Sequence, residues 1–268
     1  MKCVITRMVV CLILLLSIPA LVLAQSPGIH RILEKGAIRV GMSGTQPPFT
    51  VKSKDGTLMG YEVDLANMIA EGMKVELVLV ERPFAELLPA LERGEIDAIM
   101  SGMTMTPERN LKVAFVGPYL VSGKSILTKS SKLANVDDVE DINQKDISLT
   151  ALRGSTSQRF VEIFLPEARL TTTEDYDAGV NLVLSGQADA LIADMPICAL
   201  SMLRYPDAGL ATLVEPLTIE PIGIALPPND PLLLNMVQNY LGALEMAGIL
   251  EELETKWFKD GAWLMRLP

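Results

Sequence analysis

The sequence has few residues that could carry metal or nucleophilic chemistry. It contains three cysteines and one histidine among 268 residues, and Cys3 and Cys11 lie in an apolar N-terminal segment. The third cysteine, Cys198, lies in an apolar stretch, which favours a small buried residue over a reactive thiol. His30 is far along the chain from every other candidate residue. The mature sequence therefore lacks the residues needed for an intramolecular disulfide, for a zinc site and for a Ser-His-Asp triad. We expect no metal and no cofactor.

Positive charge is also scarce. The formal net charge is −10, and it becomes −12 when Lys2 and Arg7 are removed with the N-terminal segment (−10 − 2). A strongly acidic chain has no bulk electrostatic attraction for nucleic acid or for anionic membranes. We therefore expect no nucleic-acid partner.

Residues 1–24 have the order of a secretory signal peptide. Lys2 and Arg7 precede an apolar run over residues 8–18, Pro19 ends the run, and small side chains lead to Ala24. A membrane anchor is the alternative, but the run is short for a span of about 20 residues, and no second long run follows. We expect cleavage near Ala24, export to the periplasm, and a soluble, monomeric mature chain.

The mature sequence alternates helix and strand patterns. Phe84, Leu87, Leu88 and Leu91 follow the spacing of a helix stripe, and Gly72 is expected to end an earlier helix. Alternation of this kind favours an α/β fold with mostly parallel sheets. Strands are predicted at 37–42, 75–80, 96–100, 125–128, 147–152 and 190–193, and helices at 29–34, 61–71, 84–91, 178–184, 195–203, 232–246 and 250–258.

Two segments share one pattern. Residues 89–101 and 182–194 each run from a helix through a glycine to an Asp-Ala pair and an apolar strand, and a polar residue follows in each, Ser101 or Asp194. Chance similarity of two αβ units is one explanation; the other is that each of two lobes contains one such unit. Ligands of open α/β sheets bind beyond the carboxyl ends of strands, so these two ends would face each other across a cleft.

Arg109 is a candidate for binding a carboxylate. Thr106 and Pro107 suit the N-cap and first position of a short helix, which places Arg109 in its first turn. Arginine holds a carboxylate by two parallel hydrogen bonds, and a solvated arginine is the alternative.

Two more segments could contact a zwitterion. Gly154 and Ser155 follow a strand and open a helix, where backbone N–H groups favour negative charge, although an ordinary N-cap has the same pattern. Asp194 ends a strand before Pro196 and could cap the next helix, pair with an ammonium group, or do both.

Together these motifs resemble family 3 extracellular solute-binding proteins, the amino-acid-binding components of ABC importers. The resemblance covers nearly all of the mature chain and rests on several motifs in order. They are residues 33–41, 47–49, 60–65, 96–109, 154–156 and 188–194, and the aromatic pair at 257–258.

The resemblance implies a role for each matching residue. Arg109 would hold the ligand carboxylate, with support from the backbone of Ser155 and Thr156, and Asp194 would hold the ammonium group. The lysine/arginine/ornithine-binding member of the family has a tyrosine where this sequence has Gln46. The predicted ligand-binding set is Ser43, Gln46, Phe49, Phe84, Ser101, Gly102, Thr104, Arg109, Ser155, Thr156 and Asp194.

The family resemblance also implies the fold: α/β, a two-lobed periplasmic binding protein of type II, with a ligand cleft between lobes joined by two crossing strands. We place the crossings near Tyr119-Leu120 and Pro221-Ile222, so that residues 25–119 and 222–268 form lobe one and residues 120–221 form lobe two. A ligand that contacts both lobes stabilises the closed state. The expected function is capture of an amino acid for the membrane permease of an ABC importer.

Two alternatives use the same fold. Cyclohexadienyl dehydratases resemble these proteins and have a catalytic glutamate three residues after the aspartate that matches Asp194; here Ile197 occupies that position, so we expect no enzyme. A ligand sensor that reports to a separate partner is the second alternative. Ser43 replaces an aspartate that receives the basic side chain in the lysine/arginine/ornithine-binding relative, so we expect a neutral amino acid, with an acidic one as the alternative.

Overall fold

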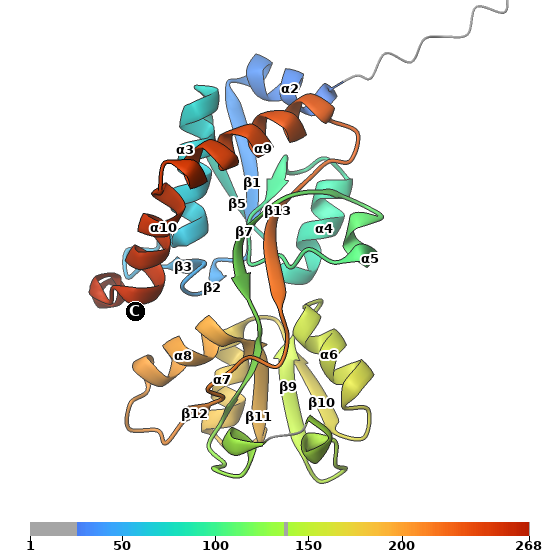
Figure 1. Cartoon of the computed structure of the whole chain (residues 1–268), viewed down its shortest axis with the longest axis vertical. Coiled ribbons are helices and arrows are strands. Elements are labelled where there is room, and N and C mark those ends of the chain that lie inside the picture. Colours follow the sequence, from blue (N-terminus) through green and yellow to red (C-terminus); the bar gives the residue numbers. More distant parts are fainter. Residues whose placement is uncertain (1–25, 137–138, 268) are drawn as a thin grey trace, which may run out of the picture.

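The computed structural model describes residues 26–136 and 139–267, and the predicted signal peptide lies outside them. In this part of the chain two five-stranded sheets are stacked along the long axis, each with its own helices (Figure 1). The first sheet has the order β5 (Glu76–Glu81), β1 (Ala37–Met42), β6 (Ala98–Ile99), β13 (Glu220–Leu226) and β7 (Ala114–Ser122). The second has the order β10 (Arg169–Thr173), β9 (Ser148–Leu152), β11 (Ala190–Asp194), β8 (Lys124–Thr128) and β12 (Ala211–Thr212).

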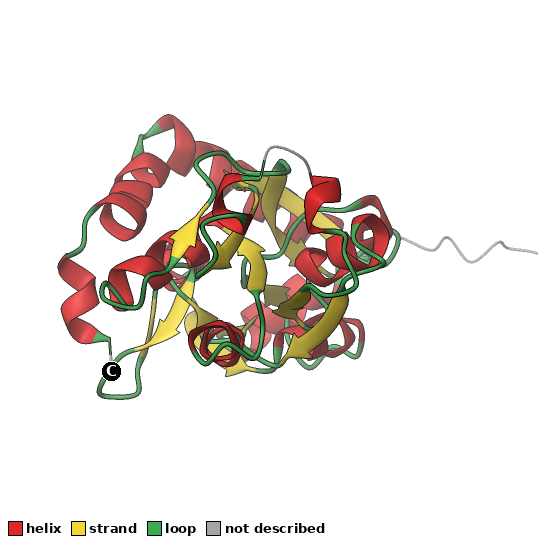
Figure 2. Ribbon diagram, turned by 90° about the horizontal axis from the view of Figure 1, so that it is seen from below, coloured by secondary structure: helices red, strands yellow, loops and turns green. Residues whose placement is uncertain are grey.

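Helices surround the strands of both sheets, as Figure 2 shows from below. The first sheet carries α2 (Pro27–Lys35), α3 (Tyr61–Met73), α4 (Phe84–Glu92), α5 (Pro107–Asn110), α9 (Pro231–Met246) and α10 (Ile249–Glu254). The second carries α6 (Thr156–Phe164), α7 (Tyr176–Leu184) and α8 (Met195–Arg204). A small sheet of β2 (Thr45–Gln46), β3 (Thr50–Lys52) and β4 (Leu58–Met59) lies beside the first. No helix within residues 26–136 and 139–267 is long and apolar enough to cross a membrane.

The α/β two-lobed fold expected from the family resemblance is confirmed. β1 pairs in parallel with both β5 and β6, and β9 pairs in parallel with β10 and β11. β6 and β11, the strands of the two segments with a shared pattern, are each the third strand of their five-stranded sheet. The similarity of residues 89–101 and 182–194 therefore reflects equivalent places in the two sheets.

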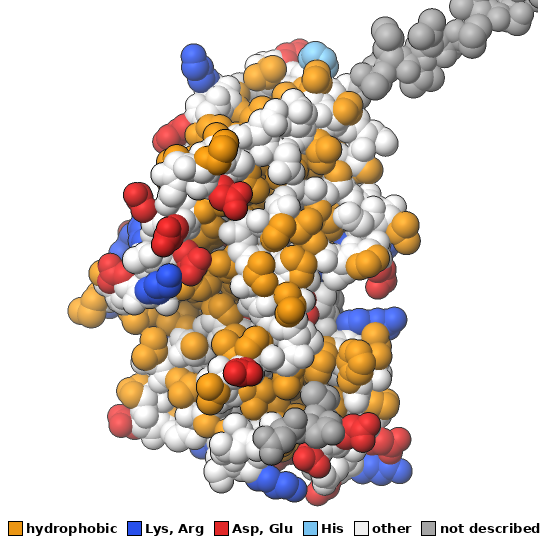
Figure 3. Space-filling model, in the orientation of Figure 1, with side chains coloured by type: hydrophobic (Ala, Val, Ile, Leu, Met, Phe, Trp, Pro, Cys, Tyr) orange, Lys and Arg blue, Asp and Glu red, His pale blue; other side chains and the backbone are white. Residues whose placement is uncertain are grey.

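Two long antiparallel strands connect the sheets. β7 and β13 pair over most of their length, with Leu120 opposite Ile222 and Val121 opposite Pro221. In Figure 3 exposed apolar side chains lie around the middle of the molecule. Val121 of β7 and Ile219 just before β13 are exposed apolar residues. We keep the predicted lobe boundaries at residues 119–120 and 221–222 as a proposal.

The expectation that Gly72 ends its helix is wrong. α3 continues through Gly72 to Met73 and ends at Lys74, which has a left-handed φ of 56°. A Cβ atom at Gly72 would lie 2.8 Å from the ring of Tyr240 on α9. The glycine therefore allows close contact between two helices and does not terminate one.

The strand predicted at 96–100 is shorter than expected. β6 comprises only Ala98 and Ile99. Before it, the carboxylate of Asp97 accepts the backbone N–H of Arg39 at 2.9 Å, while the Asp97 N–H donates to the Arg39 carbonyl at 2.7 Å. The helix predicted over 250–258 divides into α10 and a wider turn, η3 (Thr255–Lys259). The sequence reading also missed β10 and the short strands β2, β3, β4 and β12.

Candidate functional site

The ends of β1 and β6 bring three predicted residues together. Because these strands are parallel neighbours, Ser43 follows β1 beside Ser101, and the Ser43 N–H donates to Ser101 Oγ at 3.0 Å. The Ser43 hydroxyl donates to Gln46 Oε1 at 2.8 Å, and the Ser101 hydroxyl donates to the same oxygen. All three residues are buried. They form a small network of hydrogen bonds whose acceptor is the Gln46 amide oxygen.

Gly102 follows Ser101 and contacts a buried acid, Glu62, which the sequence analysis did not assign to the site. Gly102 has a left-handed φ of 58°, and its N–H donates to Glu62 Oε1 at 2.7 Å. The hydroxyl of Tyr119 on β7 donates to the same oxygen. Burial raises the pKa of Glu62 to about 7, although both hydrogen bonds act in the opposite direction. Glu62 therefore connects the predicted site with one of the two crossing strands.

Arg109 lies in α5, where the sequence placed it, and it is nearly buried. Its Nη1 donates to the Thr104 carbonyl at 2.8 Å, and its Nη2 donates to the Gly154 carbonyl at 3.2 Å. The ring of Phe84 lies 5.7 Å from the guanidinium carbon, within cation–π range. Burial lowers the pKa of Arg109, and the charges of Glu220 and Asp194 oppose this effect. Across the described residues, no carboxylate lies within 4.0 Å of this guanidinium.

The start of α6 faces Arg109. Ser155 caps the helix by accepting the Gln158 N–H at 3.1 Å, and the Ser155 hydroxyl donates to the Leu152 carbonyl. The hydroxyl oxygen of Thr156 lies 3.3 Å from that of Thr104, which forms an isolated bridge to Ile222 of β13. Arg109, Ser155 and Thr156 line one cavity of about 580 Å³. A buried cation and a helix N-terminus on one cavity can together hold a carboxylate.

The two sheets are closed against each other at this point. A Cβ atom at Gly154 would lie 3.0 Å from the Ala85 side chain at the start of α4. The contacts from Arg109 to Gly154 and from Thr104 to Thr156 also join residues that lie on opposite sides of the predicted lobe boundary. Residues of α4 and α5 are therefore in direct contact with the start of α6.

Asp194 is paired with a residue that the sequence reading missed. Its Oδ1 accepts a hydrogen bond from Lys124 Nζ at 2.7 Å, and Lys124 Nζ also lies 3.6 Å from Glu220 Oε2. β8 and β11 are antiparallel and place Lys124 directly opposite Asp194. The Lys124 and Asp194 side chains are 1% and 5% exposed, so the pair is almost removed from water. No sequence pattern indicates this ion pair, because Lys124 and Asp194 are far apart in the chain and meet only through the pairing of β8 with β11.

The remaining predicted residue, Phe49, lies in the apolar core. Its ring contacts that of Phe258 at 5.3 Å in an edge-to-face arrangement, and its side chain is 1% exposed. The structure therefore divides the predicted set into three groups around Arg109, Gln46 and Asp194, with Phe49 in the core behind them.

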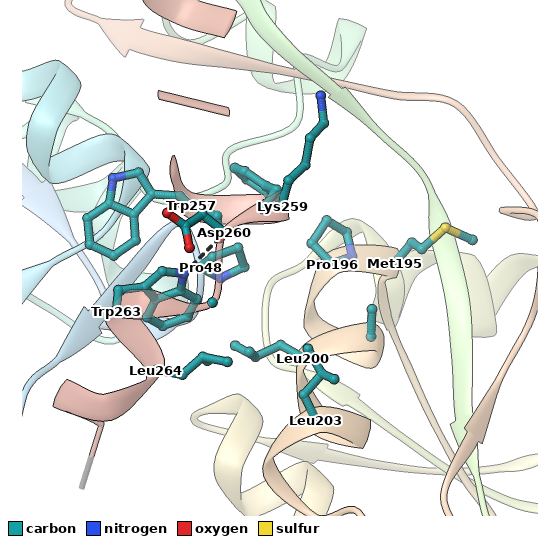
Figure 4. Close-up of a pocket in the computed structure, with 13 residues that line it drawn as sticks. Pro48, Met195, Pro196, Leu200, Leu203, Trp257, Lys259, Asp260, Trp263 and Leu264 are labelled. Carbon is teal, nitrogen blue, oxygen red and sulfur yellow. Dashed lines mark hydrogen bonds between the residues drawn. The ribbon is translucent and has the colours of Figure 1, made fainter. Parts of the chain in front are cut away.

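A second cavity lies at the junction of the two halves. It has a volume of about 250 Å³ and is lined by apolar side chains of α8, among them Leu200 and Leu203, which face Trp263 and Leu264 of the C-terminal segment (Figure 4). Pro48 also lines it, whereas none of the predicted ligand-binding residues does. Most of its lining is apolar, and Lys259 and Asp260 are the charged residues that line it.

Cys198 is the one cysteine among the described residues, and it lines none of the cavities described above. Cys198 on α8 is fully buried, and burial raises its pKa to about 12. A thiol with such a pKa is inert as a nucleophile at neutral pH, as the sequence reading expected of a buried residue.

Comparison with known proteins defines the family. The sequence profile of bacterial extracellular solute-binding proteins, family 3, matches residues 38–260. This chain therefore belongs to that family.

Its relatives are named for different functions. It is 28% identical over 249 residues to the cyclohexadienyl dehydratase of Pseudomonas aeruginosa, covering 93% of this chain and 92% of the relative. It is 33% identical over 231 residues to the L-arginine-binding protein of the same species, covering 82% and 87%. Among solved structures, a putative ABC transporter binding component from Wolinella succinogenes complexed with lysine matches with a TM-score of 0.82 and 35% identity, covering 86% of this chain and 99% of that one.

Proposed function

We propose that this chain is a periplasmic receptor that captures a free amino acid with a neutral side chain and delivers it to the permease of an ABC importer, without chemical turnover. The observation that carries the proposal is Arg109: a nearly buried guanidinium, without a carboxylate partner in the described residues, that lines a cavity between the two sheets. A ligand carboxylate would supply the missing charge. The names of several relatives, which include binders of arginine, glutamine and cystine, support an amino acid as the ligand.

The surroundings of Ser43 support a neutral side chain. Ser43 lines a cavity of about 270 Å³ together with Glu81, Glu174 and Asp175. Each acid already has a partner in the protein: Glu81 pairs with a lysine, Glu174 pairs with an arginine, and Asp175 caps α7. A basic ligand side chain would therefore have to compete for acids that are already paired.

The dehydratase relative makes an enzyme the second candidate. In this chain the position of the dehydratase glutamate is held by Ile197, which is 2% exposed and cannot transfer a proton. This supports binding without catalysis.

Calorimetry of the purified chain with a panel of the common amino acids tests the proposal. We expect at least one neutral amino acid to bind more tightly than lysine, arginine or glutamate. Prephenate and arogenate serve as the enzymatic comparison, and we expect both to remain unchanged after prolonged incubation. Consumption of either compound at an enzymatic rate, or tightest binding of a basic amino acid, would contradict the proposal.

A further inference from the structure

The charges in the site are divided unequally between its two sides. Arg109 has no carboxylate within 4.0 Å among residues 26–136 and 139–267, and Glu220 and Asp194 are the acids whose charges act on it most. On the other side Lys124 contacts both Asp194 and Glu220, so these three residues together carry a net charge of −1. Charges with little access to water are costly unless they are balanced.

The three charged residues are held in place by the fold. Lys124 and Asp194 are opposite each other in the antiparallel pair of β8 and β11. Glu220 begins the crossing strand β13, and its Oε1 accepts a hydrogen bond from the Thr218 hydroxyl at 3.0 Å. The same hydroxyl accepts the backbone N–H of Lys124 at 3.0 Å. Thr218 therefore fixes the carboxylate of Glu220 relative to the strand that carries Lys124.

Lys124 reduces the capacity of this group for further cations. Its ammonium lies 2.7 Å from Asp194 Oδ1, which leaves Asp194 with one carboxylate oxygen free of that contact. Glu220 lies farther from Lys124, at 3.6 Å, and is the acid that Lys124 compensates less closely. One additional positive charge would bring the group to neutrality, whereas two would exceed it.

We propose that Glu220 is a ligand-binding residue: together with Asp194 it holds the α-ammonium group of the amino acid, and Lys124 fixes the net charge of this subsite so that it takes one cationic group. This inference rests on the proposed function and adds a specificity-determining acid on the crossing strand. The ligand class is a zwitterion with both charged groups on one carbon and no further charge.

Matched ligand pairs test the role of Glu220. The probes are L-alanine with L-lactate, L-leucine with its hydroxy acid, and L-phenylalanine with L-phenyllactate, in which a hydroxyl replaces the ammonium group. In the unmodified protein we expect the amino acid of the best-binding pair to be favoured by about tenfold or more. Glu220→Gln should lower the ratio of amino-acid affinity to hydroxy-acid affinity by about tenfold. We expect the affinity for the hydroxy acid itself to change by no more than about twofold, because that ligand has no ammonium group to lose a partner.

Control variants separate charge from structure. Glu220→Asp keeps the carboxylate and should keep most of the preference, and Glu215→Gln removes an exposed acid of the same segment and should change nothing. If Glu220→Gln does not fold, Thr218→Val replaces it; without the hydroxyl that positions Glu220, the ratio should fall by about threefold or more.

Three results would overturn the inference. Hydroxy acids that bind the unmodified protein as tightly as amino acids would show that Lys124 already satisfies the acids, while the proposed solute capture would stand. An equal loss of both ligand types in Glu220→Gln would give Glu220 a purely structural role. No binding of any amino acid in the full panel would refute the proposed function itself, and this inference with it.

Discussion

Replacing Glu62 by glutamine should change how the stability of the protein depends on pH. Burial raises the pKa of Glu62 from 4.5 to about 7 in the folded protein. The folded chain therefore holds the proton more tightly than the unfolded chain, and the free energy of unfolding falls as the pH rises from about 4.5 to about 7. Since one pKa unit corresponds to about 1.36 kcal/mol, the total loss attributable to Glu62 is about 3 kcal/mol. Above the folded pKa this contribution is constant.

Urea denaturation at several pH values between these limits measures the effect. The difference in unfolding free energy between the unmodified protein and Glu62→Gln should decrease by about 3 kcal/mol across the range, because glutamine has no proton to lose. Glu71→Gln is the matched control: it removes an acid from the same helix at an exposed position and should not reproduce this decrease. A pH-independent difference for Glu62→Gln would show that folding does not raise the pKa of Glu62 and would refute the reasoning from burial.

Three further substitutions follow from the contacts described above. Arg109→Met should weaken amino-acid binding by about 2–5 kcal/mol in calorimetry, because a buried ligand carboxylate loses its partner, while the melting temperature of the free protein changes little. Gly154→Val should favour the open form, since its Cβ would lie 3.0 Å from Ala85 in a backbone with φ of 75°; small-angle scattering with ligand should then show a larger radius of gyration. Gly72→Val should lower the unfolding free energy by about 1–3 kcal/mol in urea denaturation, because the Tyr240 ring occupies the space that the added side chain needs. Unchanged affinity, an unchanged radius and unchanged stability, respectively, would contradict these expectations.

Elements with a strong local pattern were predicted closely. The strand at Ala37–Met42 has the predicted ends, and the helix predicted from 232 begins one residue earlier, at Pro231. The prediction at Gly72 was wrong because a glycine is needed there for close contact with α9, which lies about 170 residues later in the chain. β12 has two residues and too little pattern of its own to be found.

The candidate site shows the same division. The helix N-caps formed by Thr106 and Ser155 were predictable, because each is decided by neighbouring residues, and the structure contains both. The partnership of Lys124 with Asp194 was not predictable, since it depends on strand order and on an antiparallel register that no local pattern reveals. The contact between Glu220 and Lys124 was not predictable for the same reason.

The order of the strands in the first sheet also has a consequence for synthesis. β13 lies between β6 and β7, and apolar residues of α9 and the C-terminal segment, such as Leu241 and Trp257, share one core with Ile38 and Val40 near the start. That core requires contacts between the two ends of the chain, and contacts of such long range form slowly. Until the ribosome has added the last residues, this core lacks the side chains of α9 and of the C-terminal segment and cannot be completed. The final packing of the first sheet is therefore an event that follows synthesis of the whole chain.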